Sequence, residues 1–296
     1  MTAAPPLHLL PTDDDENPNR PHDLVLPRTN TLLMGPVNTG KTWSVRTLLT
    51  EYPDIHGKLR PGAGRTVLAA SLEPGFLDTN GDCTCDMGMH YHYIPPLDAD
   101  WDTLMSLAQQ VNRATDVTKI IDPNKRDYSQ FLDTYSMLAK FVCDRCGHDF
   151  GPIDKLDESH AVVMDGLTGL SRNAMNYTAG LKPHKSWPEY DAAGQQVENL
   201  LRKCVSIRAS FILIAHIDRE TDTTEGRTKL MMHTIGNKLA PRRSKDLFSE
   251  IIFTRRDDRQ NFLWSTVEPN MDLKARKLPF SDQIKPDFTA ILGGAE

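Results

Sequence analysis

The chain has 296 residues and a formal net charge of −6, and this length suffices for one large α/β domain with insertions, or for one domain and a small module. The acidic balance argues against a histone-like, wholly basic nucleic-acid binder, although it leaves room for a local basic channel. No run of about 18 apolar residues occurs, and no basic segment precedes an apolar one at the N-terminus, so we expect neither a membrane span nor a secretory signal.

The first part of the chain predicts an arm, a strand, a helix and a second strand. Residues 1–23 are rich in Pro and Asp, which is typical of a flexible arm. Residues 31–34 and 66–71 are short apolar runs and predict buried strands. Between them, apolar residues recur at helical spacing, which predicts a helix that extends to about Tyr52.

A phosphate-binding pattern, G-x-x-x-x-G-K-[ST], follows the first strand. Its glycines let successive backbone N–H groups point at one anion, while Lys41 brings charge to the β- and γ-phosphates and the Thr42 hydroxyl can hold Mg²⁺. We therefore expect the protein to bind ATP. The residues expected to contact the nucleotide are Gly35, Pro36, Val37, Asn38, Thr39, Gly40, Lys41 and Thr42.

Residues 76–158 lack the pattern of core α/β units, so we interpret them as an insertion, with helices near 102–113 and 128–142. The insertion contains two close cysteine pairs, and the second pair has the C-x-x-C-G-x-x-F spacing of a metal knuckle. Four thiolates would give a closed structural zinc site, and such thiol use favours a reducing, cytoplasmic location. The predicted ligands are Cys83, Cys85, Cys143 and Cys146; His90, His92 or His148 could replace one thiolate, and free buried thiols are the alternative.

The second part of the chain returns to core elements. Strands are predicted at 161–166, 210–216, 250–254 and 261–266, with a loop over 171–190, a helix over 192–205, a polar segment over 218–229 and a helix near 235–239. The last two strands flank a charged turn and predict a hairpin. The whole pattern indicates an α/β fold with a mostly parallel sheet, covered on both faces, and an antiparallel C-terminal hairpin.

Three polar residues at predicted strand ends are candidates for catalysis. Asp165 is the candidate Walker B carboxylate that would hold Mg²⁺, with a turn or helix cap as the alternative. Glu73 could orient the attacking water, and otherwise it is an ordinary loop residue. His216 could contact the γ-phosphate, and a satisfied buried histidine is an equally good interpretation.

The order of these parts resembles the RecA/RadA-like ATPase core, most closely its compact phage-encoded members. The resemblance covers residues 24–75 and about 160–288, and it gives a core of 24–75 and 159–296 around the insertion. It implies a head-to-tail homo-oligomer, a ring or a filament, that acts on single-stranded DNA in the cytoplasm of a bacterial host. A single-strand annealing or SSB-type protein is the implied partner. The cysteine-bearing insertion and the polar segment 218–229 depart from the family.

Near the C-terminus, Lys274-Ala-Arg276 resembles the Lys-x-Arg element that such ATPases insert into a neighbour's nucleotide site. Supplied in trans, these two cations would stabilise charge on the transferring phosphoryl group, so that hydrolysis depends on assembly. A solvated basic strand end is the alternative.

For DNA, the resemblance points to the loops after Asp165 and His216. The first loop mixes cations with aromatic residues, which suits a surface that tracks a DNA backbone and stacks bases. The candidate DNA-binding residues are Arg172, Lys182, Lys185 and Trp187. The second loop has no basic patch, although Lys238, Arg242, Arg243 and Lys245 could compensate.

The resulting hypothesis is a Mg²⁺-dependent, RecA-like ATPase that couples its ATP state to single-stranded DNA. One alternative is an AAA+ or packaging-type motor, which the predicted hairpin disfavours because AAA+ proteins have a helical lid there. The other is a nucleotide-gated loader or recruitment module that hydrolyses little ATP.

Overall fold

The structure is a computed structural model that describes residues 27–294, except 96–98, 123, 223–226, 233, 235–245 and 270. The expected arm, the helix near 235–239 and the basic residues from Lys238 to Lys245 lie outside the described residues.

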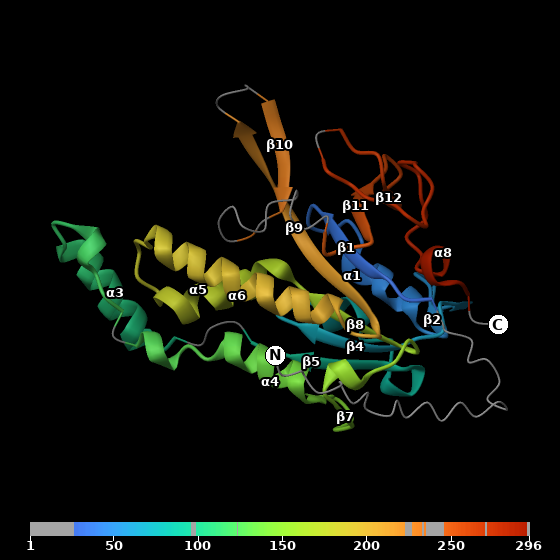
Figure 1. Cartoon of the computed structure of the whole chain (residues 1–296), viewed down its shortest axis with the longest axis horizontal. Coiled ribbons are helices and arrows are strands. Elements are labelled where there is room, and N and C mark those ends of the chain that lie inside the picture. Colours follow the sequence, from blue (N-terminus) through green and yellow to red (C-terminus); the bar gives the residue numbers. More distant parts are fainter. Residues whose placement is uncertain are drawn as a thin grey trace, which may run out of the picture.

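One large, mostly parallel sheet organises the chain, with strand order β12-β11-β1-β9-β8-β4-β5 (Figure 1). Neighbours from β11 to β5 are parallel, whereas β12 is antiparallel to β11, as the sequence predicts. The strands are β1 (Asn30–Gly35), β4 (Thr66–Ser71), β5 (Met89–Tyr93), β8 (His160–Asp165), β9 (Ser210–Asp222), β11 (Glu250–Arg256) and β12 (Phe262–Ser265). Two small hairpins stand apart, β2 (Glu51–Pro53) with β3 (Leu59–Pro61), and β6 (Phe141–Val142) with β7 (Asp149–Gly151).

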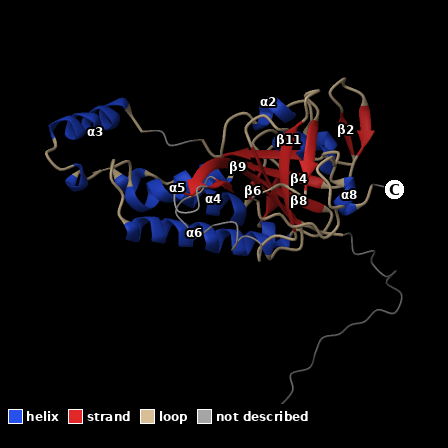
Figure 2. Cartoon of the chain, turned by 90° about the horizontal axis from the view of Figure 1, so that it is seen from above, coloured by secondary structure: helices blue, strands red, loops and turns tan. Residues whose placement is uncertain are grey.

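Helices lie on both faces of this sheet, and one, α3, extends away from it (Figure 1, Figure 2). They are α1 (Lys41–Ser44), α2 (Phe76–Asn80), α3 (Trp101–Arg113), α4 (Gln130–Ala139), α5 (Leu167–Ala179), α6 (Trp187–Val205) and α8 (Thr289–Leu292). Helices α5 and α6 run along one side of the sheet and α2 lies on the other (Figure 2).

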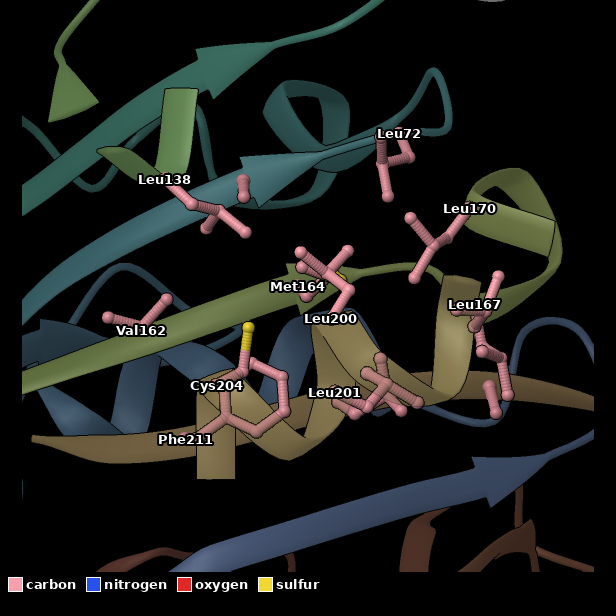
Figure 3. Packing of buried hydrophobic residues seen from close by; sticks show 14 of the residues in the cluster. Leu72, Leu138, Val162, Met164, Leu167, Leu170, Leu200, Leu201, Cys204 and Phe211 are labelled. Atoms are coloured by element: carbon pink, nitrogen blue, oxygen red, sulfur yellow. The ribbon is translucent and has the colours of Figure 1, made fainter. Parts of the chain in front are cut away.

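Alternate side chains of each central strand enter different cores, because successive residues of a strand point to opposite faces. On β8, Val162 and Met164 face α5 and α6, where they pack with Leu170 and Leu200 (Figure 3). The intervening Val163 belongs to the core on the other face, which includes residues of α2 and α8. Burying each such side chain contributes roughly 1.5–3 kcal/mol, so the strand ends are held on a rigid sheet.

The helix expected to continue to Tyr52 is shorter than predicted. Helix α1 ends at Ser44, a 3₁₀ turn follows over Val45–Leu48, and β2 begins at Glu51. The carbonyl groups that could continue a helix are occupied, since Thr47 accepts from the N–H of Ala63 and Leu48 accepts from that of Arg65. The segment 62–65 therefore replaces the next helical turn.

Three other segments differ from the sequence prediction. The segment 76–158, interpreted as an insertion, supplies β5 to the main sheet and α4 to its core, while α3 extends away from the sheet (Figure 1). The expected loop over 171–190 is mostly helix, because α5 extends to Ala179 and α6 begins at Trp187. The expected polar segment after residue 217 is a hairpin, in which β9 continues to Asp222 and pairs with β10 (Arg227–Met232).

Candidate functional site

Two glycines shape the loop between β1 and α1. A Cβ on Gly35 would lie 2.2 Å from the Thr254 hydroxyl oxygen, and one on Gly40 would lie 2.5 Å from the Phe262 ring. Gly40 also has a φ of 82°, in the left-handed region that favours glycine. The close packing of the β11–β12 hairpin therefore requires glycine at both positions.

Lys41 is folded back onto this loop. Its Nζ donates hydrogen bonds to the carbonyl oxygens of Gly35 at 2.9 Å and Pro36 at 2.6 Å, and the residue is 4% exposed. Burial lowers the pKa of Lys41 to about 8, although the nearby carboxylates of Asp165 and Glu73 oppose the shift. The Lys41 ammonium group thus lies against the loop 35–42, and its hydrogen-bond acceptors there are neutral carbonyl groups.

Thr42 and Asp165 contact each other at the sheet edge where β8 ends. The Thr42 hydroxyl donates to Oδ2 of Asp165 at 2.8 Å. Asp165 is the last residue of β8 and is 7% exposed. Burial raises the pKa of its carboxyl to about 6, while the hydrogen bond from Thr42 acts in the opposite direction. The pair offers two hard oxygen donors, the kind that Mg²⁺ prefers.

Glu73 and His216 form a second pair at the same edge. Glu73 follows β4, and its Oε2 lies 3.0 Å from Nε2 of His216, while the Gly169 N–H lies 3.3 Å from Oε1. The hydrogen bond from His216 lowers the pKa of Glu73, although burial opposes the shift. Both side chains are about one quarter exposed. His216 is not at a strand end as predicted, because β9 continues beyond it; it lies opposite Gly35 in the sheet register.

The structure also brings a residue to the loop that the sequence analysis missed. Arg256 lies in β11 rather than in the predicted turn, and its Nη2 donates to Oδ1 of Asn38 at 2.9 Å. Its guanidinium lies 4.8 Å from the centre of the Phe262 ring. The sequence could have indicated this position, because Arg256 ends a strand that is parallel to β1, and the carboxyl ends of parallel strands lie at one edge of the sheet.

The candidate DNA-binding residues are on or between helices. Arg172 is exposed on α5, and Trp187, the first residue of α6, is 78% exposed. Lys182 lies 2.5 Å from the Glu189 carboxylate, and Nζ of Lys185 donates to the Lys182 carbonyl. The expected loop over 171–190 is therefore reduced to 180–186, and its two lysines are engaged within the chain.

Lys274 and Arg276 lie far along the sheet from the loop 35–42, the candidate P-loop. The backbone of Lys274 forms an antiparallel β-bridge with Ile251, near the start of β11, and its Nζ donates to the Phe248 carbonyl at 2.8 Å. The Arg276 N–H donates to the buried Glu250 carboxylate, and the residue is exposed. Because β11 and β1 are parallel, this is the opposite sheet edge from Gly35. These residues cannot serve their own chain's loop, and their role in a neighbour's site stays a prediction.

A second site lies beside β5. The ligand atoms of Cys85, His90, Cys143 and Cys146 all lie within 4.8 Å of one another, a set that could hold a metal ion such as zinc. The Gly147 N–H donates to the Cys143 carbonyl, and the Tyr91 N–H lies 3.5 Å from the Cys143 sulfur. Burial opposes ionisation of Cys143, but the backbone N–H groups of Tyr91, Cys146 and Arg145 lower the pKa of its thiol.

Cys83 is not part of this cluster, so the predicted set of four cysteines is wrong at one position. Cys83 is fully buried in the core that includes Phe76 and Tyr91, and burial raises the pKa of its thiol to about 11. His90, on β5, takes the fourth position, as one of the three histidines considered in its place. The C-x-C spacing alone does not show which of the two cysteines is buried in the core and which lies at the metal site.

Comparison with models of protein families and with curated proteins gives no match to this sequence. Among the described helices, none is long and apolar enough to cross a membrane.

Proposed function

We propose that the protein is a Mg²⁺-dependent ATPase that binds its nucleotide on the loop 35–42. One observation carries this proposal: Lys41, the Thr42–Asp165 pair and Glu73 converge beyond the carboxyl ends of β1, β8 and β4. Ligands of open α/β sheets bind at this edge, and a G-x-x-x-x-G-K-T loop supplies phosphate contacts there.

The chain's own groups suit phosphoryl transfer to water. Lys41 would exchange its carbonyl acceptors for phosphate oxygens, which are better partners for an ammonium ion. Thr42 and Asp165 would hold Mg²⁺, which supplies charge neutralisation on the phosphates when bound. Glu73, kept ionised by His216, would accept a hydrogen bond from the attacking water and orient it.

A head-to-tail, RecA-like assembly is the second part of the proposal. Lys274 and Arg276 lie at the sheet edge opposite the P-loop, so a neighbour stacked on that edge could receive them at its own nucleotide. The expected result for Arg276→Ala is unchanged ATP binding with turnover lowered at least about 10³-fold, as for other arginine fingers. Full turnover in this variant would remove the trans-finger assignment.

Single-stranded DNA is the proposed partner. Strand β9 carries His216 beside Glu73 and continues without interruption into the hairpin with β10, which projects from the sheet (Figure 1). The same strand could thus transmit the nucleotide state to a bound strand of DNA. Trp187 offers an exposed ring for base stacking, a contact worth about 1–3 kcal/mol.

A nucleotide-gated loader with little hydrolysis is the second candidate. The observation that favours it is the engagement of both Glu73 oxygens by His216 and the Gly169 N–H, which leaves the carboxylate occupied. An AAA+ or packaging-type motor is less favoured, because the β11–β12 hairpin packs on the P-loop where a helical lid would be needed.

Steady-state ATP hydrolysis, with and without single-stranded DNA, tests the proposal in the wild type and in Lys41→Ala. Stimulation by DNA that disappears in the variant supports the DNA-coupled ATPase. Slow turnover that ignores DNA, together with tight ATP binding, supports the loader. No ATP binding by the wild type would refute both.

A further inference from the structure

We propose that metal occupancy of the cluster Cys85/His90/Cys143/Cys146 strengthens nucleotide binding, with Asp82 and Arg46 as positioning residues between the two sites. This inference rests on the proposed nucleotide site. Its basis is a chain of hydrogen bonds from the metal knuckle to the segment that follows the P-loop.

The first link joins the knuckle to the segment 79–82. Arg145 stands between the ligands Cys143 and Cys146, and its Nη1 donates to the Cys83 carbonyl at 2.8 Å. Its Nη2 lies 3.3 Å from the Gly81 carbonyl. Cys85, which follows this segment closely in the chain, is a cluster ligand, so a bound metal and Arg145 together would fix the chain at the C-terminal end of the segment.

The second link joins the same segment to Arg46. Both guanidinium nitrogens Nη1 and Nη2 of Arg46 reach the Asp82 carboxylate, at 3.1 and 3.0 Å, and Nη2 also donates to the Thr79 carbonyl. Arg46 is 3% exposed. A cation this deeply buried depends on its partners. Asp82 supplies the negative charge among them, and the Pro53 carbonyl, 2.8 Å from Nη1, is a further partner outside this segment.

The third link reaches the P-loop itself. Asn80 is fully buried, and its Nδ2 donates to the Thr42 carbonyl at 2.9 Å, while its Oδ1 accepts from Nε of Arg46 at 3.3 Å. Helix α1 has only four residues, and so short a helix depends on tertiary contacts for its geometry. The contacts from 79–82 therefore hold the carbonyl side of Thr42, whose hydroxyl faces Asp165.

The energetic consequence is a coupling between the two sites. If the metal orders 79–82, it orders the segment that positions Thr42, and the nucleotide binds to an already arranged loop. Such coupling is reciprocal, so nucleotide must raise the affinity for the metal by the same factor by which the metal raises the affinity for nucleotide.

The test compares zinc-loaded full-length protein with protein stripped by a zinc-selective chelator, in Mg²⁺ buffer, with fluorescent mant-ADP as the probe. We expect the Kd for mant-ADP to rise about 10-fold on stripping, within the usual range of allosteric coupling. Equal affinity in both forms would overturn the inference while leaving the nucleotide site intact. If the loaded protein binds no mant-ADP, the proposed function fails as well.

A variant pair keeps the test decisive if the stripped protein unfolds. Asp82→Asn removes the charge that holds Arg46 but no cluster ligand, whereas Asp86→Asn makes the same change at an exposed residue next to Cys85. At full zinc occupancy, Asp82→Asn should weaken mant-ADP binding about 10-fold and Asp86→Asn should leave it unchanged.

Equilibrium competition for zinc with a chromogenic chelator gives the reciprocal measurement, which a purely structural role would not produce. Unlabelled ADP should raise the zinc affinity of the wild type and of Asp86→Asn, but not that of Asp82→Asn. Wild-type mant-ADP affinity in Asp82→Asn, or a zinc affinity that ADP raises equally in all three proteins, would overturn the assignment.

Discussion

Replacing Asp165 with asparagine should stabilise the nucleotide-free protein while it abolishes ATP turnover. Asp165 is 7% exposed, and burial raises the pKa of its carboxyl from 3.8 to about 6. Since one pKa unit corresponds to about 1.36 kcal/mol, ionisation of this group opposes folding by about 3 kcal/mol near pH 7. Asparagine carries no charge to desolvate and keeps an oxygen that can accept the hydrogen bond from Thr42.

The pH dependence gives this prediction its sign. Between the unfolded pKa of 3.8 and the folded pKa of about 6, the folded state retains a proton that the unfolded state has lost. The contribution of Asp165 to wild-type stability therefore falls as the pH rises through this window. The advantage of Asp165→Asn should be about 3 kcal/mol near pH 7 and should disappear near pH 4.

Urea unfolding followed by tryptophan fluorescence measures this difference, in EDTA and without nucleotide so that no ligand contributes. Asp258→Asn is the matched control, because it removes an exposed carboxylate in the turn between β11 and β12. The reasoning would be refuted if Asp165→Asn were no more stable than the wild type near pH 7, or if its stability advantage over the wild type were as large near pH 4 as near pH 7.

Three further predictions concern the two sites. Gly40→Ala should lower the free energy of unfolding by about 1–3 kcal/mol and weaken ATP binding, because the new Cβ would combine a positive φ with an aromatic ring at 2.5 Å. Gly57→Ala is the control: Gly57 has a φ of 76° and open space around it, so the variant should lose only the stability that backbone strain costs. Equal losses of stability in urea unfolding would contradict the packing argument. Cys146→Ser should reduce bound zinc per chain, measured by atomic absorption, whereas Cys83→Ser should retain it; the reverse result would restore the set of four cysteines. Glu73→Gln should keep ATP affinity and lower turnover by about 10²-fold or more, and unchanged turnover would remove its role in orienting water.

The sequence predicted the sheet and identified much of the candidate nucleotide site because both depend on local patterns. Continuous apolar runs predicted five strands of the parallel sheet and the edge hairpin. The G-x-x-x-x-G-K-[ST] motif identified Lys41 and Thr42 as candidate phosphate and metal ligands. Asp165 and Glu73 were predicted from their positions after apolar strands. Parallel strands bring such ends to one edge, so their proximity followed from the fold class.

The errors arose where a long-range contact or an overlooked local signal decided the structure. The helix after Thr42 ends early because the segment 62–65 takes its carbonyl groups, which no local pattern reveals. The start of α6 had a local signal, since Ser186 and Glu189 form a capping box around a proline. The exchange of Cys83 for His90 depends on tertiary packing, because Cys83 is buried in the core while His90 lies with the other three ligands.

The electrostatics of the proposed nucleotide site argue most directly that it serves a ligand. Burial lowers the pKa of Lys41 to about 8 and raises that of Asp165 to about 6, so both ions are held where their charge is unfavourable. Selection for stability alone would favour apolar residues in such positions. Perturbed groups of opposite charge at the carboxyl edge of a parallel sheet are typical of sites whose ligand supplies the missing partners. An anionic phosphate beside Lys41 and a cation beside Asp165 would satisfy both groups at once, and this requirement is met by a nucleotide bound together with a divalent metal ion.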